Sequence, residues 1–261
     1  MQLFITINAC VFGLVFGSFA NVVIYRLPRG ESIATPPSHC PSCGKQLAAL
    51  DLIPVFSWLF LRRRCRYCRK KISSRYPAVE LLCSVLFACM ALYAGPTIAV
   101  VPLCMLAFAL ICISLIDADS QTIPDSLVIF GAAFGVIWVA ASYFFDLNAP
   151  SVPDALLGAL AAAGPLFLID RVCLLVLKKD GFGFGDVKLM LMAGLYLGWR
   201  AAIVSLFIAV IAGGLFGGAL LATGKIKKGG YFAFGPFLAV GVVAALWFTD
   251  AILNFYFPVF I

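Results

Sequence analysis

Residues 98–119 read IAVVPLCMLAFALICISLIDAD, an apolar run that ends at two aspartates, Asp117 and Asp119. The 19 residues before Asp117 carry no charged side chain, and a helix of that length and composition can cross a bilayer. The rest of the chain is similar, since 63% of its 261 residues are hydrophobic and only 12% are charged. A water-soluble fold of this size could not bury so much apolar surface, so the sequence predicts a membrane protein.

Eight apolar segments are separated by polar loops, and we therefore predict an all-α polytopic membrane protein with about eight transmembrane helices. The first segment is too long for the core of a signal peptide and has no basic residue before it, so we interpret it as a helix that is retained. The predicted spans are Leu3–Ile24, Ala78–Tyr93, Ile98–Ile116, Ser126–Phe145, Ala155–Leu177, Val187–Trp199, Ala201–Thr223 and Phe232–Thr249.

The basic residues indicate the orientation in the membrane. Eleven of the 19 lie between Arg26 and Arg75, and two smaller groups flank later loops. With eight spans all three groups fall on one side, which the positive-inside rule makes cytoplasmic, and both termini face away from the cytoplasm. This rule also accounts for the net charge of +7, so we expect no nucleic-acid partner, although the cluster suits contact with anionic lipid. The smaller groups are Lys178, Lys179 and Lys188, and Lys225, Lys227 and Lys228.

Four of the ten cysteines have the spacing of metal ligands. Cys40-Pro-Ser-Cys43 and Cys65-Arg-Tyr-Cys68 are two CxxC pairs separated by 21 residues, a pattern typical of a tetrahedral zinc site. Four thiolates leave no open position for water, so we expect a structural zinc that staples a small cytoplasmic insert at 26–76. The alternative is a redox dithiol or two disulfides, which a reducing cytoplasm disfavours.

The chain has a single histidine, His39, directly before the first of these cysteines. It is a second candidate ligand in place of one cysteine. One histidine cannot form the HExxH motif, so a zinc protease of that type is excluded.

Residues 52–61, between the two cysteine pairs, are nearly all apolar. Ten residues are too few to cross the membrane. We expect this segment to pack against the insert or to lie on the membrane surface.

Two loops on the predicted cytoplasmic side carry carboxylates beside the ends of spans. Asp117 to Asp125 follows one span, and Gly183-Phe184-Gly185-Asp186 precedes another. Acidic residues at such positions are costly and mark functional sites. Two close aspartates that share one proton can hydrolyse a peptide bond, because the ionised one activates water and the protonated one donates to the carbonyl. The glycines let backbone and substrate approach closely.

The spacing does not decide which aspartate partners Asp186. Asp117 lies next to the end of its span and is favoured. Asp119 would face away from Asp117 if the helix continued. Asp125 follows Pro124 and precedes a span, which is typical of a helix N-cap.

Other polar or glycine-rich positions have simpler interpretations. Asp170 and Arg171, inside a span, are predicted to form a local ion pair or to reach the membrane edge. Glu80 could pair with a basic loop residue or with substrate. A glycine group predicts close helix packing through two overlapping GxxxG patterns, formed by Gly213, Gly214, Gly217 and Gly218.

These features together resemble the bacterial type IV prepilin peptidases (prepilin leader peptidase/N-methyltransferases) over nearly the whole chain. The resemblance implies a GxGD aspartic protease with catalytic Asp117 and Asp186, supported by a loop that includes Gly183, Gly185 and Asp125. The matching residues are Gly17-Ser-Phe-Ala-Asn-Val-Val-Ile-Tyr-Arg-Leu-Pro28, the two CxxC pairs, Ile72-Ser-Ser-Arg-Tyr-Pro-Ala-Val-Glu-Leu-Leu82, Ile116-Asp117, Ile123-Pro-Asp125, the GxGD segment and Phe234-Gly-Pro236. Arg63 and Arg64 stand where the family often has a glycine.

The resemblance also implies the reaction and its place. Such enzymes cleave a short basic leader after a glycine from prepilins or pseudopilins of type IV pili and type II secretion, at the cytoplasmic face of the inner membrane. Many then methylate the new N-terminal amine with S-adenosylmethionine, for which we assign no binding residue. We therefore expect a first transmembrane helix at 1–25, the zinc insert at 26–76 and a peptidase core at 77–261, with prepilins and the lipid bilayer as partners.

Three other functions fit parts of the sequence. A presenilin-like GxGD protease would act on other substrates, but it lacks the four-cysteine insert. A proton-coupled transporter should show internal repeats and broken midplane helices, and neither is clear here. A non-catalytic assembly scaffold would not depend on the aspartates.

Overall fold

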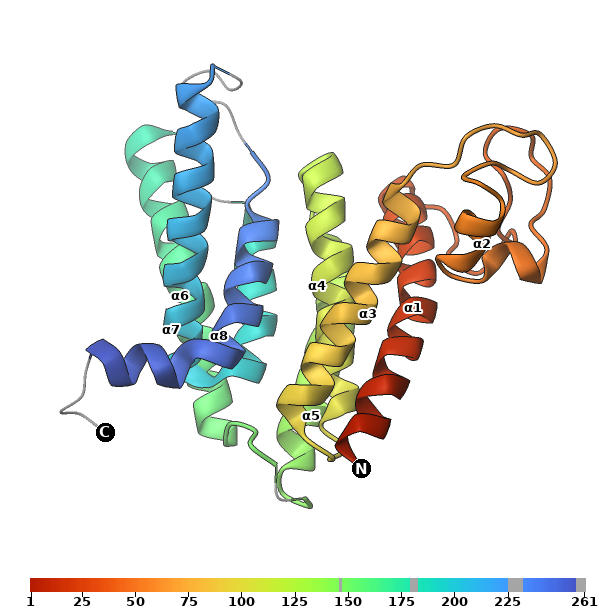
Figure 1. Ribbon diagram of the computed structural model, residues 1–261. Coiled ribbons are helices and arrows are strands. Elements are labelled where there is room, and N and C mark those ends of the chain that lie inside the picture. Colours follow the sequence, from red (N-terminus) through yellow and green to blue (C-terminus); the bar gives the residue numbers. More distant parts are fainter. Residues whose placement is uncertain (146, 179–182, 225–231, 257–261) are drawn as a thin grey trace. The chain divides into compact units, whose positions relative to one another are not determined.

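The computed structural model describes residues 1–145, 147–178, 183–224 and 232–256. Over these residues the chain is almost entirely helical and has no β-strand, so the predicted all-α fold class is confirmed (Figure 1). The chain divides into two compact units, Met1–Cys112 and Ile113–Ile261. Lys179, Lys225, Lys227 and Lys228 of the predicted basic groups lie outside the described residues.

The first unit is built on α1 (Gln2–Arg26) and α3 (Arg75–Ala94), which pack against each other, and on the first part of α4 (Val100–Ser120). The contact between α1 and α3 passes through two glycines spaced four residues apart. A Cβ on Gly13 would lie 2.6 Å from the Cα of Ser84, and one on Gly17 only 2.5 Å from the Cα of Glu80. This is a GxxxG contact that brings backbones together, at a place where the sequence predicted none.

The insert between α1 and α3 contains a short helix and two 3₁₀ turns. These elements are η1 (Leu27–Arg29), η2 (Ala49–Leu52) and α2 (Phe56–Phe60). Each cysteine pair has one isolated β-bridge beside it, His39 with Gln46 and Arg64 with Lys71. The insert belongs to the same compact unit as α1 and α3. The three-part functional division of the chain stays a prediction.

The second unit contains the end of α4 and four further helices, of which α7 packs against the other three. These helices are α5 (Asp125–Ala141), α6 (Val152–Leu177), α7 (Phe184–Ala222) and α8 (Gly235–Tyr256). A Cβ on Gly158 of α6 would lie 2.5 Å from the carbonyl oxygen of Gly194, and one on Gly194 would lie 2.4 Å from that of Gly158. The α6–α7 contact therefore also depends on paired glycines.

The helix α7 is broken at Gly198, whose φ of 69° and ψ of 173° are not helical. The break separates an arm at 184–197 from an arm at 199–222, and the chain reverses direction between them (Figure 1). The Asp154 carboxylate accepts the N–H of Trp199 at 3.3 Å and so caps the second arm. Glycine is required here because φ is positive and because a Cβ would lie 2.4 Å from the Asp154 carboxylate.

Six of the described helices are long and apolar enough to cross a membrane, namely α1, α3, α4, α6, α7 and α8. The helix α5 is apolar but has only 17 residues. The break in α7 at Gly198 lies close to Arg200, the residue between the predicted spans Val187–Trp199 and Ala201–Thr223. The prediction of a polytopic membrane fold is thus confirmed, while the number of eight spans stays a prediction.

The predicted GxxxG group is only partly used for packing in the described structure. A Cβ on Gly213 or Gly217 would approach the rings of Phe234 or Phe232, at 2.6 Å and 3.1 Å. A Cβ on Gly214 or Gly218 would meet no atom of the described residues within 4 Å. The partners are therefore phenylalanine rings and not the backbone of another helix.

We predict that Gly194→Ala destabilises the protein and that Gly214→Ala does not. At position 194 the added methyl group meets backbone atoms that cannot move aside easily, which costs about 1–3 kcal/mol. At position 214 it meets open space, and alanine favours a helix over glycine by about 1 kcal/mol. Thermal unfolding of the purified protein in detergent measures both. Equal melting temperatures for the two variants would contradict the contact.

Candidate active site and metal centre

The two predicted catalytic aspartates lie at helix ends in the second unit. Asp117 is in the last turn of α4 and Asp186 in the first turn of α7, and both are buried, at 6% and 8% exposure. The Oδ2 of Asp117 accepts the backbone N–H of Gly235 at 2.8 Å. Asp117 is also close enough for its charge to act on the Asp186 carboxyl. The structure therefore brings these two aspartates into one site.

Glycines bring the backbone close to both aspartates. A Cβ on Gly235 would lie 2.8 Å from the Oδ2 of Asp117, and one on Gly183 would lie 3.5 Å from the Oδ2 of Asp186. Gly185 meets Ile123 of the segment after α4, where an added Cβ would lie 2.8 Å from the Cβ of that isoleucine. The GxGD segment is thus seated against the segment that follows Asp117. The contact of Gly235 was not predicted, although Phe234-Gly-Pro236 at a helix start marked the position.

Asp125 has a different role from the predicted N-cap. The N-cap of α5 is Pro124, Asp125 is the first helical residue, and no side chain caps this helix end. The N-cap prediction is therefore wrong. Lys188 donates from Nζ to the Oδ1 of Asp125 at 2.7 Å, which links the start of α5 to the first turns of α7 beside Asp186. Asp119 lies exposed at the end of α4.

The other two acids singled out in the sequence have local partners. Glu80 is buried, and its Oε2 accepts the backbone N–H of Val55 at 2.7 Å, so an uncharged group of the insert takes the place expected for a basic residue. Asp170 pairs with Arg171 at 3.0 Å, and the predicted local ion pair is confirmed.

The four predicted metal ligands form one cluster. The sulfurs of Cys40, Cys43, Cys65 and Cys68 all lie within 4.8 Å of one another, and those of Cys40 and Cys68 are 3.8 Å apart. Zinc–sulfur bonds of about 2.3 Å in a tetrahedron place the sulfurs about 3.8 Å apart. The donor set and its spacing therefore fit a zinc ion. His39 is not part of the cluster, and its Nδ1 lies 3.2 Å from the carbonyl oxygen of Pro37.

The two cysteine pairs have the same backbone fold. In the first, the Cys40 carbonyl accepts the N–H of Gly44 at 2.8 Å, and in the second the Cys65 carbonyl accepts the N–H of Arg69 at 3.1 Å. Gly44 and Arg69 also share a positive φ, of 66° and 60°. Two matching turns of this kind are typical of paired zinc knuckles.

The crowded thiols ionise unequally. Burial raises the pKa of the Cys40 thiol, but hydrogen bonds from Ser42 and Cys43 outweigh it, and the pKa is lowered to about 7. For the Cys68 thiol, a hydrogen bond with the backbone of Lys70 lowers the pKa. Burial and hydrogen bonds with the other three cysteines raise it by more, so that the pKa is about 11. A bound cation removes this conflict because it holds all four sulfurs as thiolates.

Comparisons with known proteins match both parts of the chain that carry the candidate sites. A family model described as the Bacterial Peptidase A24 N-terminal domain matches residues 11–94, which include the cysteine cluster and Glu80. A model described as the type IV leader peptidase family matches residues 104–218, which include Asp117 and the GxGD segment. No solved structure matches the chain.

Relatives match along almost the whole length. The prepilin leader peptidase/N-methyltransferase of Pseudomonas putida is 35% identical, over 94% of this chain and 91% of the relative. The enzyme of the same name from Stutzerimonas stutzeri is 35% identical over 92% and 89%, and that from Bacillus subtilis is 35% identical over 94% and 95%. These matches confirm the resemblance seen in the sequence, and the chain belongs to the type IV leader peptidase family, a family of aspartic peptidases.

Proposed function

We propose that this membrane protein cleaves the short basic leader of type IV prepilins or pseudopilins, using Asp117 and Asp186. The observation that carries the proposal is the pair of buried carboxylates, one at the end of α4 and one in the GxGD turn at the start of α7. Members of the family with the same overall length are named prepilin leader peptidase/N-methyltransferase, which supports this substrate class.

The dyad supplies the acid and the base of a hydrolysis. The two carboxyls share one proton, so the ionised one takes a proton from water as the water oxygen attacks the scissile carbonyl carbon. The protonated one donates to the carbonyl oxygen. When the carbon–nitrogen bond breaks, the carboxyl that took the water proton gives it to the leaving nitrogen, which becomes the amine of the mature protein. A hydroxyl of the tetrahedral intermediate returns its proton to the other carboxylate as the carbonyl forms again, which restores the dyad. The N–H of Gly235, which donates to the Oδ2 of Asp117, positions this carboxylate.

The orientation and location belong to the same proposal. We place the insert, Asp117 and Asp186 on the cytoplasmic side of the bacterial inner membrane, with both termini on the periplasmic side. The distribution of lysine and arginine supports this, because basic loops remain in the cytoplasm.

The second activity would methylate the new amine with S-adenosylmethionine, and the names of the relatives support it. The insert has two cavities that differ in their lining. One, of about 280 Å³, is lined by four cations that would repel a sulfonium, namely Arg62, Arg63, Arg64 and Lys71. The other, of about 270 Å³, is mainly apolar, and its Arg66 already pairs with Asp51. Neither cavity has a carboxylate in its lining that could balance the sulfonium, so neither fits this cofactor.

No observation favours the alternative functions. The N-terminal family model matches the residues of this chain that include the cysteine cluster. This match favours a leader peptidase over a presenilin-like protease or a proton-coupled transporter. We further propose that the cluster binds one structural zinc ion and that the acids between Asp117 and Asp125 attract the basic leader.

We predict that Asp117→Asn and Asp186→Asn each lower leader cleavage by about 10²–10⁴-fold or more, since each removes one partner of the acid–base pair. The measurement is the rate at which purified protein in detergent converts a prepilin to its mature form. Asp250→Asn, an exposed change in α8, is the control and should cleave normally. An unchanged cleavage rate for Asp186→Asn would contradict the dyad mechanism.

We predict that Asp119→Asn slows cleavage of a basic leader a few-fold and leaves a neutral leader unaffected. An exposed charge attracts a cationic peptide only modestly, and salt screens the attraction. Rates are compared for two prepilins that differ only in replacing leader lysines with glutamines. If Asp119→Asn changed the cleavage rates of both prepilins equally, the acids would not recognise the charge of the leader.

We predict that Cys43→Ser or Cys68→Ser removes the bound zinc, whereas Cys89→Ser, outside the cluster, retains about one zinc per chain. Metal analysis of the purified variants measures this. Because the ligands must be thiolates, zinc affinity should fall as pH is lowered. Full zinc content in both cluster variants would exclude four-cysteine ligation.

A further inference from the structure

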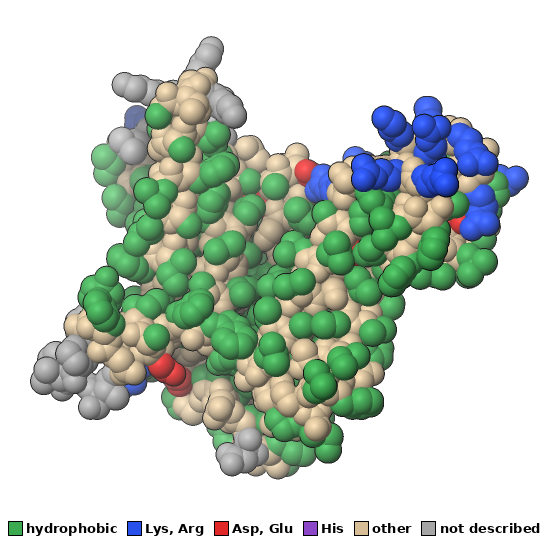
Figure 2. Space-filling model, viewed as in Figure 1, with side chains coloured by type: hydrophobic (Ala, Val, Ile, Leu, Met, Phe, Trp, Pro, Cys, Tyr) green, Lys and Arg blue, Asp and Glu red, His purple; other side chains and the backbone are tan. Residues whose placement is uncertain are grey.

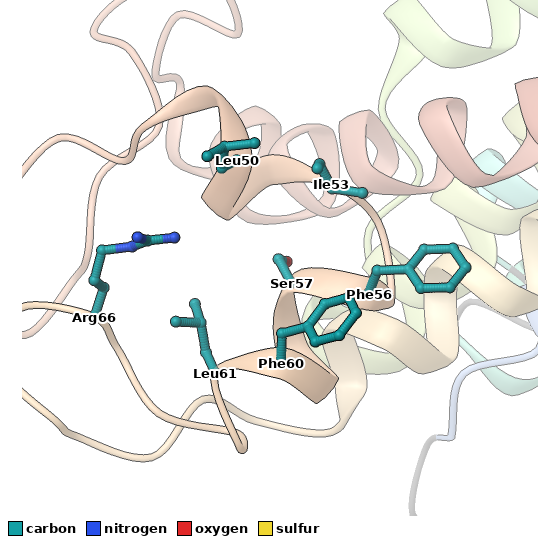
Figure 3. Close-up of a pocket in the computed structure, with 7 residues that line it drawn as sticks. All are labelled: Leu50, Ile53, Phe56, Ser57, Phe60, Leu61 and Arg66. Atoms are coloured by element: carbon teal, nitrogen blue, oxygen red, sulfur yellow. The ribbon is translucent and has the colours of Figure 1, made fainter.

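The insert presents an apolar face that the described structure leaves uncovered. We define this face by Leu50, Ile53, Phe56, Leu59 and Phe60, of which Phe60 is 83% exposed. The rings of Phe56 and Phe60 lie side by side along α2, with Leu50 and Ile53 across a cavity of about 270 Å³ (Figure 3). Exposed apolar patches of this kind mark contacts with another protein or with a membrane.

The position of this face along the helices indicates its depth. Glu80 binds the N–H of Val55, the residue that precedes α2, and Glu80 lies five residues inside α3. At 1.5 Å per residue, the start of α2 is therefore held about 7.5 Å along α3 from its first residue. The helix α3 has 20 residues and is about 30 Å long, which matches a hydrocarbon core of about 30 Å. Its first residue therefore lies near the edge of the core, and the start of α2 lies about 7.5 Å from that edge, within the depth of about 5–10 Å at which interfacial helices bury their apolar face.

The charge of the insert indicates what kind of surface its apolar face contacts. Residues 27–74 contain nine basic and two acidic residues. Next to the apolar face, a cavity of about 280 Å³ is lined by Trp58, Arg62, Arg63, Arg64 and Lys71, and the Arg63 guanidinium stacks 4.8 Å from the centre of the Trp58 ring. Figure 2 shows lysine and arginine over one side of the insert and hydrophobic side chains over the side below. An amphipathic surface of this type suits an anionic bilayer.

We propose that the insert is a membrane-surface anchor. Its apolar face lies in the interfacial layer of the bilayer, and the basic cavity binds the phosphate of an anionic phospholipid headgroup. The flanking helices α1 and α3 keep the face at this layer, which favours a lipid occupant over a soluble one. A basic leader peptide is excluded from the cavity by charge.

The test places a tryptophan on the face of the full-length protein and measures its depth in nanodiscs with brominated lipids. Phe60→Trp is compared with Val15→Trp on the exposed side of α1 and with Lys70→Trp two residues after the second cysteine pair, after subtraction of the wild-type signal. We expect bromines near the headgroups to quench Phe60→Trp, bromines deeper in the chains to quench Val15→Trp, and Lys70→Trp to be quenched least. Zinc content confirms that each variant is folded.

A second arm tests the lipid charge. In discs that contain phosphatidylglycerol, quenching of Phe60→Trp should exceed that in phosphatidylcholine alone, and Arg62→Gln with Arg64→Gln should reduce the gain. Each basic residue that reaches the headgroups strengthens binding about fivefold. Equal quenching in both lipids would overturn the anionic site. The anchor would be overturned if Phe60→Trp were quenched no more than Lys70→Trp. If, in that case, the emission of the Phe60→Trp tryptophan shifted only when prepilin was added, the apolar face would bind protein instead of lipid.

Discussion

A carboxylate among membrane helices must find its hydrogen-bond donors inside the protein, because lipid offers none. For three of the acids in this chain, the donor is a backbone N–H group at a place where a helix starts. Asp117 accepts from Gly235 at the start of α8, Asp154 from Trp199 at the start of the second arm of α7, and Glu80 from Val55 before α2. The first turn of a helix is the one place where such groups are not already bonded within the helix.

This constraint explains why glycine accompanies the acids. At two of these sites a Cβ would collide with the carboxylate, namely at Gly235 beside Asp117 and at Gly198 beside Asp154. Glycine also sets the helix contacts, through Gly17 against Glu80 and Gly158 against Gly194. Since apolar side chains gain little by leaving lipid, close backbone packing is what holds such helices together. The positions of the acids and the packing of the helices therefore both depend on glycine residues.

How far the sequence could predict these features depended on whether the signal was local. Spans and paired cysteines are read from composition and spacing, and the apolar helices and the thiol cluster agree with them. The pairing of Lys188 with Asp125 joins residues 63 positions apart, and that of Gly235 with Asp117 joins residues 118 apart. No pattern in one sequence states such contacts. The N-cap expected at Asp125 was wrong by one residue, because α5 begins at Asp125 itself and Pro124 is its N-cap.

The separation of charge along the chain links the proposed peptidase to the proposed anchor. A basic leader is itself attracted to anionic headgroups, so lipid competes with the enzyme for it. An insert with nine basic residues occupies such headgroups and repels the leader at short range, while the segment from Asp117 to Asp125 has three acids and no base. Screening limits both effects to about 8–10 Å, so they act together only if both segments lie at the same membrane face. In the orientation that we propose from the positive-inside rule, both segments lie at that face, and the most favourable position for the leader is then beside the acids that we propose cleave it.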